Sequence, residues 1–181
     1  MLVDAAQASL LVVDMQERLV PATHEPKKVV RGCHMLQQGF AQLDLPMLQS
    51  EQYPKGLGRT LPELAHNKAR SFEKLAFSAW RSDNLKSAFE DLKSSGRSQV
   101  VVSGVESHVC VLQTAMDLKA IGFEPFVVAD AVSSRLPESK ELALARLRAN
   151  GVEVVTVEMV LFELLAKAGT AEFKALSALI K

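Results

Sequence analysis

The stretch QVVVSGVESHVC, residues 99–110, joins an apolar run of strand length to a segment with helical periodicity. The run 99–103 is rich in valine and is followed by Gly104, which predicts a buried strand that ends in a tight turn. The pattern over 107–121 predicts a helix that is apolar on most of its sides. Cys110 falls in the first turn of this helix. Small α/β proteins often hold ligands at such junctions, so Cys110 is either a catalytic nucleophile or a small buried hydrophobic side chain.

Strand-length apolar runs alternate with helix-period segments on both sides of this stretch. The predicted strands are residues 9–14, 45–50, 70–74, 99–103, 124–129 and 152–157, and the predicted helices are 26–43, 82–95, 107–121, 138–150 and the segment from 158 onward. This alternation predicts a mostly parallel sheet with helices on both faces, which is a three-layer α/β/α fold. Three strands before the long crossover and three after it predict the Rossmann-like strand order 3-2-1-4-5-6. Without a repeat, linker or low-complexity tract, residues 1–181 are expected to form one domain.

Composition excludes several classes of function. Lys plus Arg and Asp plus Glu are 21 each, and no basic cluster with interleaved aromatic residues occurs, so we expect no nucleic-acid partner. The apolar runs are shorter than the roughly 20 residues of a membrane span. Two cysteines make no disulfide framework and suit a reducing compartment. The amino terminus resembles neither a signal nor a transit peptide, so we expect a cytoplasmic protein, with a mitochondrial location left open.

The predicted strand order brings a carboxylate and a thiol together. Strands one and four would be neighbours, and their carboxyl ends carry Asp14 and the turn before Cys110. A buried Asp at a strand end is either a catalytic base or a cap for the loop that follows. His108 is not the expected base, because side chains two residues apart on a helix diverge, so it should face solvent or a neighbour. Cys33 lies on the apolar stripe of the helix over 26–43 and is interpreted as core packing.

Two features are expected to favour the thiolate form of Cys110. The amino terminus of a helix lowers the pKa of a cysteine placed in its first turn. Lys74 closes the third predicted strand, so its side chain can reach the same edge of the sheet. There it would hold Asp14 ionised and support the thiolate.

Three motifs together resemble the isochorismatase-like, or cysteine hydrolase, family. They are VVDMQ at 12–16, EKLAFSAW at 73–80 and GVESHVC at 104–110, and the similarity continues through VVADAVSSR at 127–135. The subgroup that the chain most resembles comprises YcaC-like and isochorismatase domain-containing hydrolases.

The resemblance implies a set of site residues. It places an Asp–Lys–Cys catalytic triad on Asp14, Lys74 and Cys110. It also implies a cis peptide bond between Val105 and Glu106, and an oxyanion hole formed by the N–H groups of Glu106 and Cys110.

Departures from relatives narrow the expected reaction. Nicotinamidases of this family carry an Asp and a His, two residues apart, after the second strand to bind a metal. Here the matching positions hold Glu51 and Tyr53, and Glu51 with His66 makes a poor zinc set, so we expect no metal. True isochorismatases act on a vinyl ether and generally lack the cysteine, whereas Cys110 favours covalent acyl transfer. Neither a GxGxxG nor a GxxxxGK[ST] motif occurs, and no cofactor is expected.

These features favour a hydrolase that cleaves a small-molecule amide or related acyl C–N bond through a Cys110 thioester. The alternative is a non-catalytic binding or interaction protein that retains the scaffold. The loops over 51–66 and 75–82 would set specificity, although their sequence names no substrate. The candidates for lining the substrate pocket are Gln16, Tyr53, Phe77 and Trp80, with core packing an equal alternative for Phe77. Asp130 and Arg135 are expected to pin a loop or a subunit contact.

The segment 157–180 predicts self-association. One of its apolar stripes, Val160, Leu161, Leu164, Leu165 and Ala168, can cover the last strand of the same subunit. The second stripe, Phe173, Leu176, Leu179 and Ile180, would stay exposed unless a partner buries it. Relatives are commonly dimers or larger closed assemblies, often with the pocket near a subunit boundary, so the resemblance also implies a homo-oligomer. The alternative is a helical pair folded wholly onto its own domain.

Overall fold

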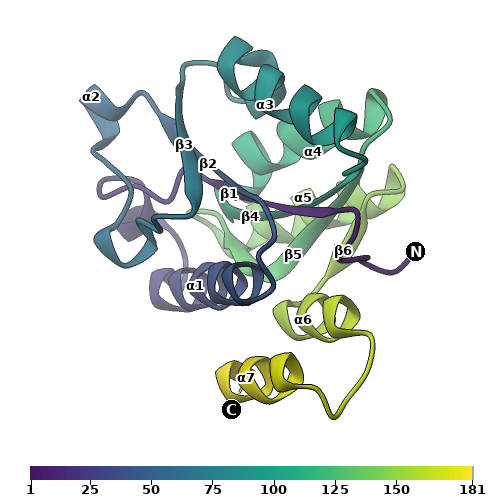
Figure 1. The fold of residues 1–181 in the computed structure, drawn as a ribbon. Coiled ribbons are helices and arrows are strands. Elements are labelled where there is room, and N and C mark those ends of the chain that lie inside the picture. The colour runs from purple at the N-terminus through teal and green to yellow at the C-terminus, as the bar shows by residue number, and fades with distance from the viewer. Residues whose placement is uncertain (181) are drawn as a thin grey trace.

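A six-stranded, all-parallel sheet forms the centre of the computed structural model, which describes residues 1–180 apart from the side chain of Leu179. The strands are β1 (Ala8–Val13), β2 (Met47–Gln52), β3 (Ala69–Lys74), β4 (Gln99–Val105), β5 (Glu124–Ser133) and β6 (Glu153–Val155). Their order across the sheet is β3-β2-β1-β4-β5-β6, which confirms the predicted order (Figure 1). The end of β1 therefore lies between the ends of β2 and β4.

Helices cover both faces of the sheet, so the fold is the predicted three-layer α/β/α arrangement. One face is packed by α1 (Pro26–Gln42) and α6 (Val157–Leu165), with α7 (Ala171–Ile180) outside them. The other face is packed by α3 (Asp83–Ser94), α4 (Leu112–Ala120) and α5 (Pro137–Ala149). Short turns complete the chain: α2 (Pro54–Leu57), η1 (Val20–Ala22), η2 (Pro62–Leu64), η3 (Ala79–Arg81) and the π-helical η4 (Ser107–Val111). No described helix has the length and apolar character that crossing a membrane would require.

The central strand β1 is buried along its whole length. Leu10 and Val12 point into the core beneath α1, and Leu11 and Val13 point into the core beneath α3 and α4. Such a strand reads as a continuous apolar run because both of its faces are covered. This is why β1 was recognisable from sequence and why it can place a polar side chain at its end with little water nearby.

Gly104 lets β4 lie close to β1 at the edge where both strands end. Its φ of +105° is in the region that favours glycine, and a Cβ there would overlap the carbonyl oxygen of Val13. Next to this position the register between β4 and β5 shifts between Val102 and Gly104. Both β4 and β5 continue beyond their predicted ends at 103 and 129, whereas β6 is shorter than predicted.

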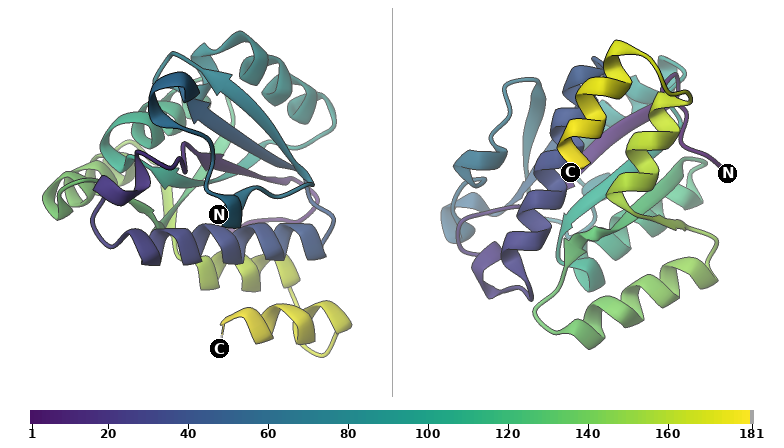
Figure 2. Two further views of the ribbon diagram at one scale, coloured as in Figure 1. Left: turned by 90° about the vertical axis from the view of Figure 1, so that its left-hand side faces the viewer. Right: turned by 90° about the horizontal axis from the view of Figure 1, so that it is seen from below.

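The two terminal helices pack largely against their own domain. Figure 2 shows α7 alongside α1, where Leu176 is fully buried and Ile180 contacts the core. The prediction that the second apolar stripe stays exposed is therefore wrong for these two residues, and the Leu179 side chain lies outside the described residues. The missing side chain at Gly39 of α1 makes room for Leu161 of α6, and the reversal after α6 returns α7 to α1.

The large apolar side chains that remain exposed in this region are on α6 instead. Met159 is 45% exposed and Phe162 is 42% exposed, the latter with its ring centroid 6.2 Å from that of the half-buried Phe173.

Candidate active site

A fully buried ion pair lies at the carboxyl edge of the sheet. Asp14 directly follows β1 and Lys74 is the last residue of β3, and the Lys74 Nζ is 2.8 Å from the Asp14 Oδ2. Neither side chain has exposed surface. A buried charge is tolerated only when its partner and its remaining hydrogen bonds are in place, so this pair depends on its neighbours.

Asp14 is held by side chains and not by the loop that follows it. The Ser50 hydroxyl donates to Asp14 Oδ1 at 2.7 Å, and Lys74 donates to Oδ2. The turn after the strand is closed by backbone atoms, since the Gln16 N–H donates to the Asp14 carbonyl oxygen. The backbone of Asp14 has a φ of 48°, which is uncommon for a residue other than glycine. These contacts argue against the interpretation of Asp14 as a cap for the loop that follows.

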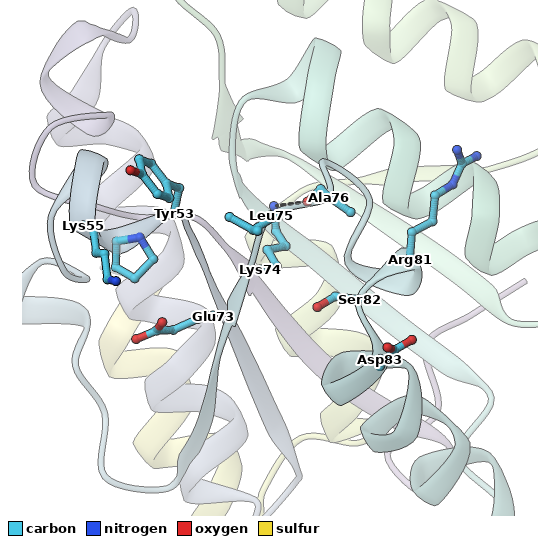
Figure 3. A pocket seen from close by; sticks show the side chains of 10 residues that line it. Tyr53, Lys55, Glu73, Lys74, Leu75, Ala76, Arg81, Ser82 and Asp83 are labelled. Atoms are coloured by element: carbon cyan, nitrogen blue, oxygen red, sulfur yellow. Dashed lines mark hydrogen bonds between the residues drawn. The ribbon is translucent and has the colours of Figure 1, made fainter.

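The ammonium group of Lys74 is saturated by acceptors inside the protein. Besides Asp14, it donates to Gln52 Oε1 at 2.6 Å and to the carbonyl oxygens of Ala76 and Phe77 at 3.3 and 3.1 Å (Figure 3 marks the contact with Ala76). An ammonium has three N–H groups, so four acceptors leave none for a substrate. Lys74 can therefore act on Asp14 and the thiol by its charge, but it has no donor to spare for a bound molecule.

Cys110 lies beside this pair in the π-helical turn η4. Its side chain packs in the core beneath α3 and α4, and the residue is 5% exposed. Burial and, next to it, the Asp14 charge raise the pKa of the Cys110 thiol to about 12, with Lys74 acting in the opposite direction. The predicted lowering by the helix terminus is thus wrong, because burial and the nearby carboxylate outweigh the helix. The resting thiol is protonated, and the adjacent carboxylate is the group that can accept its proton.

The turn between β4 and η4 is fixed from outside by an ion pair. The peptide bond between Val105 and Glu106 is cis, and Val105 is buried. The Glu106 carboxylate accepts a hydrogen bond from Arg135 Nε at 2.9 Å. Arg135, which follows β5, thus holds a loop, which is one of the two roles expected for it.

His108 and Asp130 also have structural contacts. The His108 Nδ1 lies 3.0 Å from the hydroxyl of the buried Ser134, so this ring faces a neighbouring loop, as expected. The Asp130 carboxylate accepts from the N–H of Val157, the first residue of α6. A carboxylate at a helix amino terminus stabilises the helix, so Asp130 anchors the terminal helices to β5.

A pocket of about 500 Å³ opens next to the site, on the outer side of β3. Figure 3 shows it between α2 and the start of α3, with Tyr53 and Lys55 on one wall and Arg81 and Asp83 on the other. Lys74 lines the pocket, whereas Asp14 and Cys110 do not. In a single copy of the chain, this space borders Lys74, whose side chain has no exposed surface, and it does not enclose the thiol.

Of the four predicted pocket residues, only Tyr53 lines this cavity. Gln16 is fully buried, and its amide is occupied by the backbone of Gln52 and Gly58, so it braces two loops and is not free for a ligand. Trp80 packs against Phe89 of α3. Phe77 is 54% exposed, so its interpretation as core packing is wrong.

The residues considered for a metal are engaged in other contacts. Glu51 accepts from the N–H and the hydroxyl of Thr60 through one oxygen and from Arg59 Nη1 through the other. His66 Nδ1 accepts from the N–H of Lys68. Among residues 1–180, no group of three or more His, Cys, Asp and Glu side chains is placed to hold a metal ion.

Ser50 and Gln52, the two β2 side chains that contact the ion pair, were not among the predicted site residues. A signal was present, because the strand ends in QSEQ, residues 49–52, and four consecutive polar residues are unusual in a strand buried on both faces. Ser50 and Gln52 alternate with Gln49 and Glu51, so they share one side of the strand.

A pH-dependent stability follows from the second thiol. Burial raises the pKa of Cys33 to about 12 from its ordinary value near 9. The fold favours the protonated thiol, so this contribution is complete below about pH 9 and is lost as the pH rises towards 12, at up to about 1.4 kcal/mol per pH unit. We expect the urea midpoint to fall above pH 9, and to fall less steeply in Cys33→Ala. Equal slopes in both proteins would show that Cys33 does not titrate in this way.

A family model and curated proteins match most of this chain. Residues 8–159 match the family model described as the isochorismatase domain. The curated isochorismatase domain-containing protein 2 of Danio rerio is 40% identical over 172 residues, covering 94% of this chain and 85% of the relative.

Solved structures share the whole fold. A protein described as the MAR1 ribonuclease of Caenorhabditis elegans has a TM-score of 0.91 and 30% identity, with 99% of this chain and 92% of that chain covered. YcaC of Escherichia coli, described as an octameric hydrolase of unknown specificity, has a TM-score of 0.90 and 25% identity, with 99% and 90% covered. YcaC of Pseudomonas aeruginosa, solved with hexane-2,5-diol and covalent acrylamide, has a TM-score of 0.89 and 25% identity, with 98% and 90% covered.

These matches confirm the resemblance inferred from the three motifs and support a hydrolase role. With the family model covering most of its length, the chain belongs to the isochorismatase domain family.

Proposed function

We propose that this chain is a cysteine hydrolase that cleaves a small-molecule amide or a related acyl C–N bond. The observation that carries the proposal is the Cys110 thiol placed beside a fully buried Asp14–Lys74 ion pair. A buried nucleophile, a carboxylate that can take its proton and a cation that holds the carboxylate are the parts that acyl transfer needs. The covalent acrylamide described for the Pseudomonas relative supports a nucleophilic group on this scaffold.

The proposed reaction begins from the neutral thiol. As Cys110 Sγ attacks the carbonyl carbon, its proton passes to Asp14, and the carbonyl oxygen becomes an oxyanion. Collapse of this intermediate breaks the C–N bond, and Asp14 returns the proton to the leaving amine. Water then attacks the thioester, which releases the acid and restores the thiol.

The proposed oxyanion donors are the N–H groups of Glu106 and Cys110, as the family resemblance implies. The Arg135–Glu106 ion pair supports this assignment because it fixes the turn that carries the Glu106 N–H. Donors held in place before the reaction stabilise the developing charge without reorganising.

A screen for product release tests the proposal. Small neutral amides, carbamates and ureas would be offered first, because Lys74 has no free donor for a substrate carboxylate. An RNA substrate belongs in the same screen because of the name of the Caenorhabditis relative. Hydrolysis of a C–N bond that depends on Cys110 supports the proposal. RNA cleavage that persists in Cys110→Ala would reject it, and so would binding of small molecules without any turnover, as a non-catalytic scaffold would show.

We also propose that the chain self-associates. The octameric description of the Escherichia coli relative supports this, as do the exposed Leu75 and Phe77 beside the site and Met159 and Phe162 on α6. Sedimentation velocity at micromolar concentration should give a species heavier than the 19.7 kDa monomer. A single monomeric species across the concentration range would refute the proposal.

A further inference from the structure

We infer that Gln52 is a positioning residue that fixes the ammonium group of Lys74 on Asp14. The inference rests on the proposed function, and it assigns to Gln52 an effect on the reactivity of Cys110 although Gln52 need not touch the substrate.

Both ends of the Gln52 amide contact the end of β3. The Oε1 accepts from Lys74 Nζ at 2.6 Å, and the Nε2 donates to the carbonyl oxygen of Leu75 at 2.7 Å. Gln52 and Lys74 are also paired in the sheet register. The amide therefore spans two consecutive residues of the neighbouring strand, and this fixes which of its atoms faces the ammonium group.

The backbone of Gln52 is held as firmly as its side chain. The buried Gln16 accepts from the Gln52 N–H at 2.7 Å and donates to the Gln52 carbonyl oxygen at 3.0 Å. A contact chain thus runs from Gln16 through Gln52 and Lys74 to Asp14. With its backbone and both side-chain ends bonded, Gln52 can orient Lys74 at little further cost in side-chain entropy.

An amide suits this position better than a carboxylate. Asp14 is the one carboxylate that contacts the Lys74 amine in the described structure. A neutral acceptor from Gln52 satisfies an N–H group without competing for the positive charge. A second carboxylate would share the ammonium group, and its negative charge would make the nearby thiol harder to deprotonate.

Other titratable groups near the pair are occupied elsewhere. Glu51, which precedes Gln52 on β2, and Glu73 on the neighbouring β3 both bond Arg59. On the side of η4 and β5, Glu106 bonds Arg135 and His108 lies against Ser134. The nearby cations other than Lys74 therefore already have partners. A negative charge introduced at position 52 would act mainly on Lys74, Asp14 and Cys110.

The test compares Gln52→Glu with Gln52→Met, which keeps the side-chain length but removes both hydrogen bonds. The readout is the rate of acrylamide addition to Cys110 between pH 6 and 12, a range that reaches the raised pKa of this thiol, so that a displaced profile differs from a uniform loss of rate. It is measured by mass spectrometry with the fully buried Cys33 as internal reference. We expect Gln52→Glu to displace the pH profile upward by about one unit. Gln52→Met should lower the rate about tenfold, and its pH profile should be displaced less than that of Gln52→Glu. Gln42→Glu, at the exposed end of α1, adds the same charge far from the site and should match the wild type.

The outcomes separate this inference from the proposed function. If acrylamide does not add to Cys110 of the folded wild type at all, or if Asp14→Asn leaves its profile unchanged, the proposed function fails. If wild type behaves as proposed but both Gln52 variants slow the reaction equally with the same pH profile, Gln52 is merely structural and the inference fails. Circular dichroism checks the fold of each variant. If Gln52→Glu does not fold, Gln52→Asn takes its place. Its amide retains the acceptor but sits one methylene too short, so wild-type alkylation in Gln52→Asn would overturn the inference.

Discussion

Cys110→Ala is expected to reduce hydrolysis of any amide substrate by at least about 10⁴-fold, because the variant has no atom that can form the acyl-enzyme. The fold should survive the change. Removing one small sulfur atom from the core costs on the order of 1–2 kcal/mol in the free energy of unfolding. Steady-state turnover and a thermal melt of the same sample measure the two effects.

Cys33→Ala is the matched control for this experiment. It deletes the same atom from the other cysteine, which is buried on the inner face of α1 with its Sγ 3.5 Å from the carbonyl oxygen of Ala131. Its melting temperature should fall by a similar amount while turnover stays near that of the wild type. Comparable loss of turnover in both variants would point to a packing effect, and undiminished turnover in Cys110→Ala would reject the covalent route.

Lys74→Met should be the most destabilising single change at the site. It leaves the Asp14 carboxylate fully buried without its cation, which costs roughly 3–5 kcal/mol when one partner of a buried pair is removed. Turnover should also be lost, since the carboxylate would take up a proton in the resting state and could no longer accept one from the thiol. Urea unfolding at neutral pH measures the free energy, and the loss should shrink at acidic pH, where the carboxyl is neutral in the unfolded chain as well.

The double variant Asp14→Asn/Lys74→Met separates stability from catalysis. It has no uncompensated charge, so most of the lost free energy of unfolding should return, but turnover should not. A double variant that is no more stable than Lys74→Met would mean that the loss in the single variant came from packing of the lysine stem and not from the buried charge.

The site residues that could be found from the sequence are those fixed by topology. Asp14, Lys74 and Cys110 each lie at or just after the carboxyl end of a strand, and parallel strands bring such ends to one edge. Their proximity follows from strand order alone. The direction in which the pKa of the Cys110 thiol shifts does not follow from strand order. It depends on how deeply η4 is buried and on how close the thiol lies to Asp14.

Side chains beyond this set could not be placed by periodicity. Gln16 and Phe77 are two or three residues past strand ends, where the chain turns and alternation no longer indicates which way a residue points. Gln16 turned inward to bond the β2–β3 connection, and Phe77 turned outward. The packing of α7 against its own domain could not be predicted either. An apolar stripe on a helix has the same sequence pattern whether the same domain or a partner covers it.

The missing side chain at Gly104 has a consequence for how this scaffold can vary. The separation of β1 and β4 there is set by direct backbone contact. Asp14 directly follows β1, and Cys110 lies in η4, the turn that follows β4. Backbone contact, and not the composition of the core, therefore sets how closely the ends of these two strands approach each other. If the proposed function holds, we expect laboratory evolution for new substrates to tolerate changes in the loops around Tyr53 and Phe77 while this backbone contact keeps Asp14 and Cys110 together.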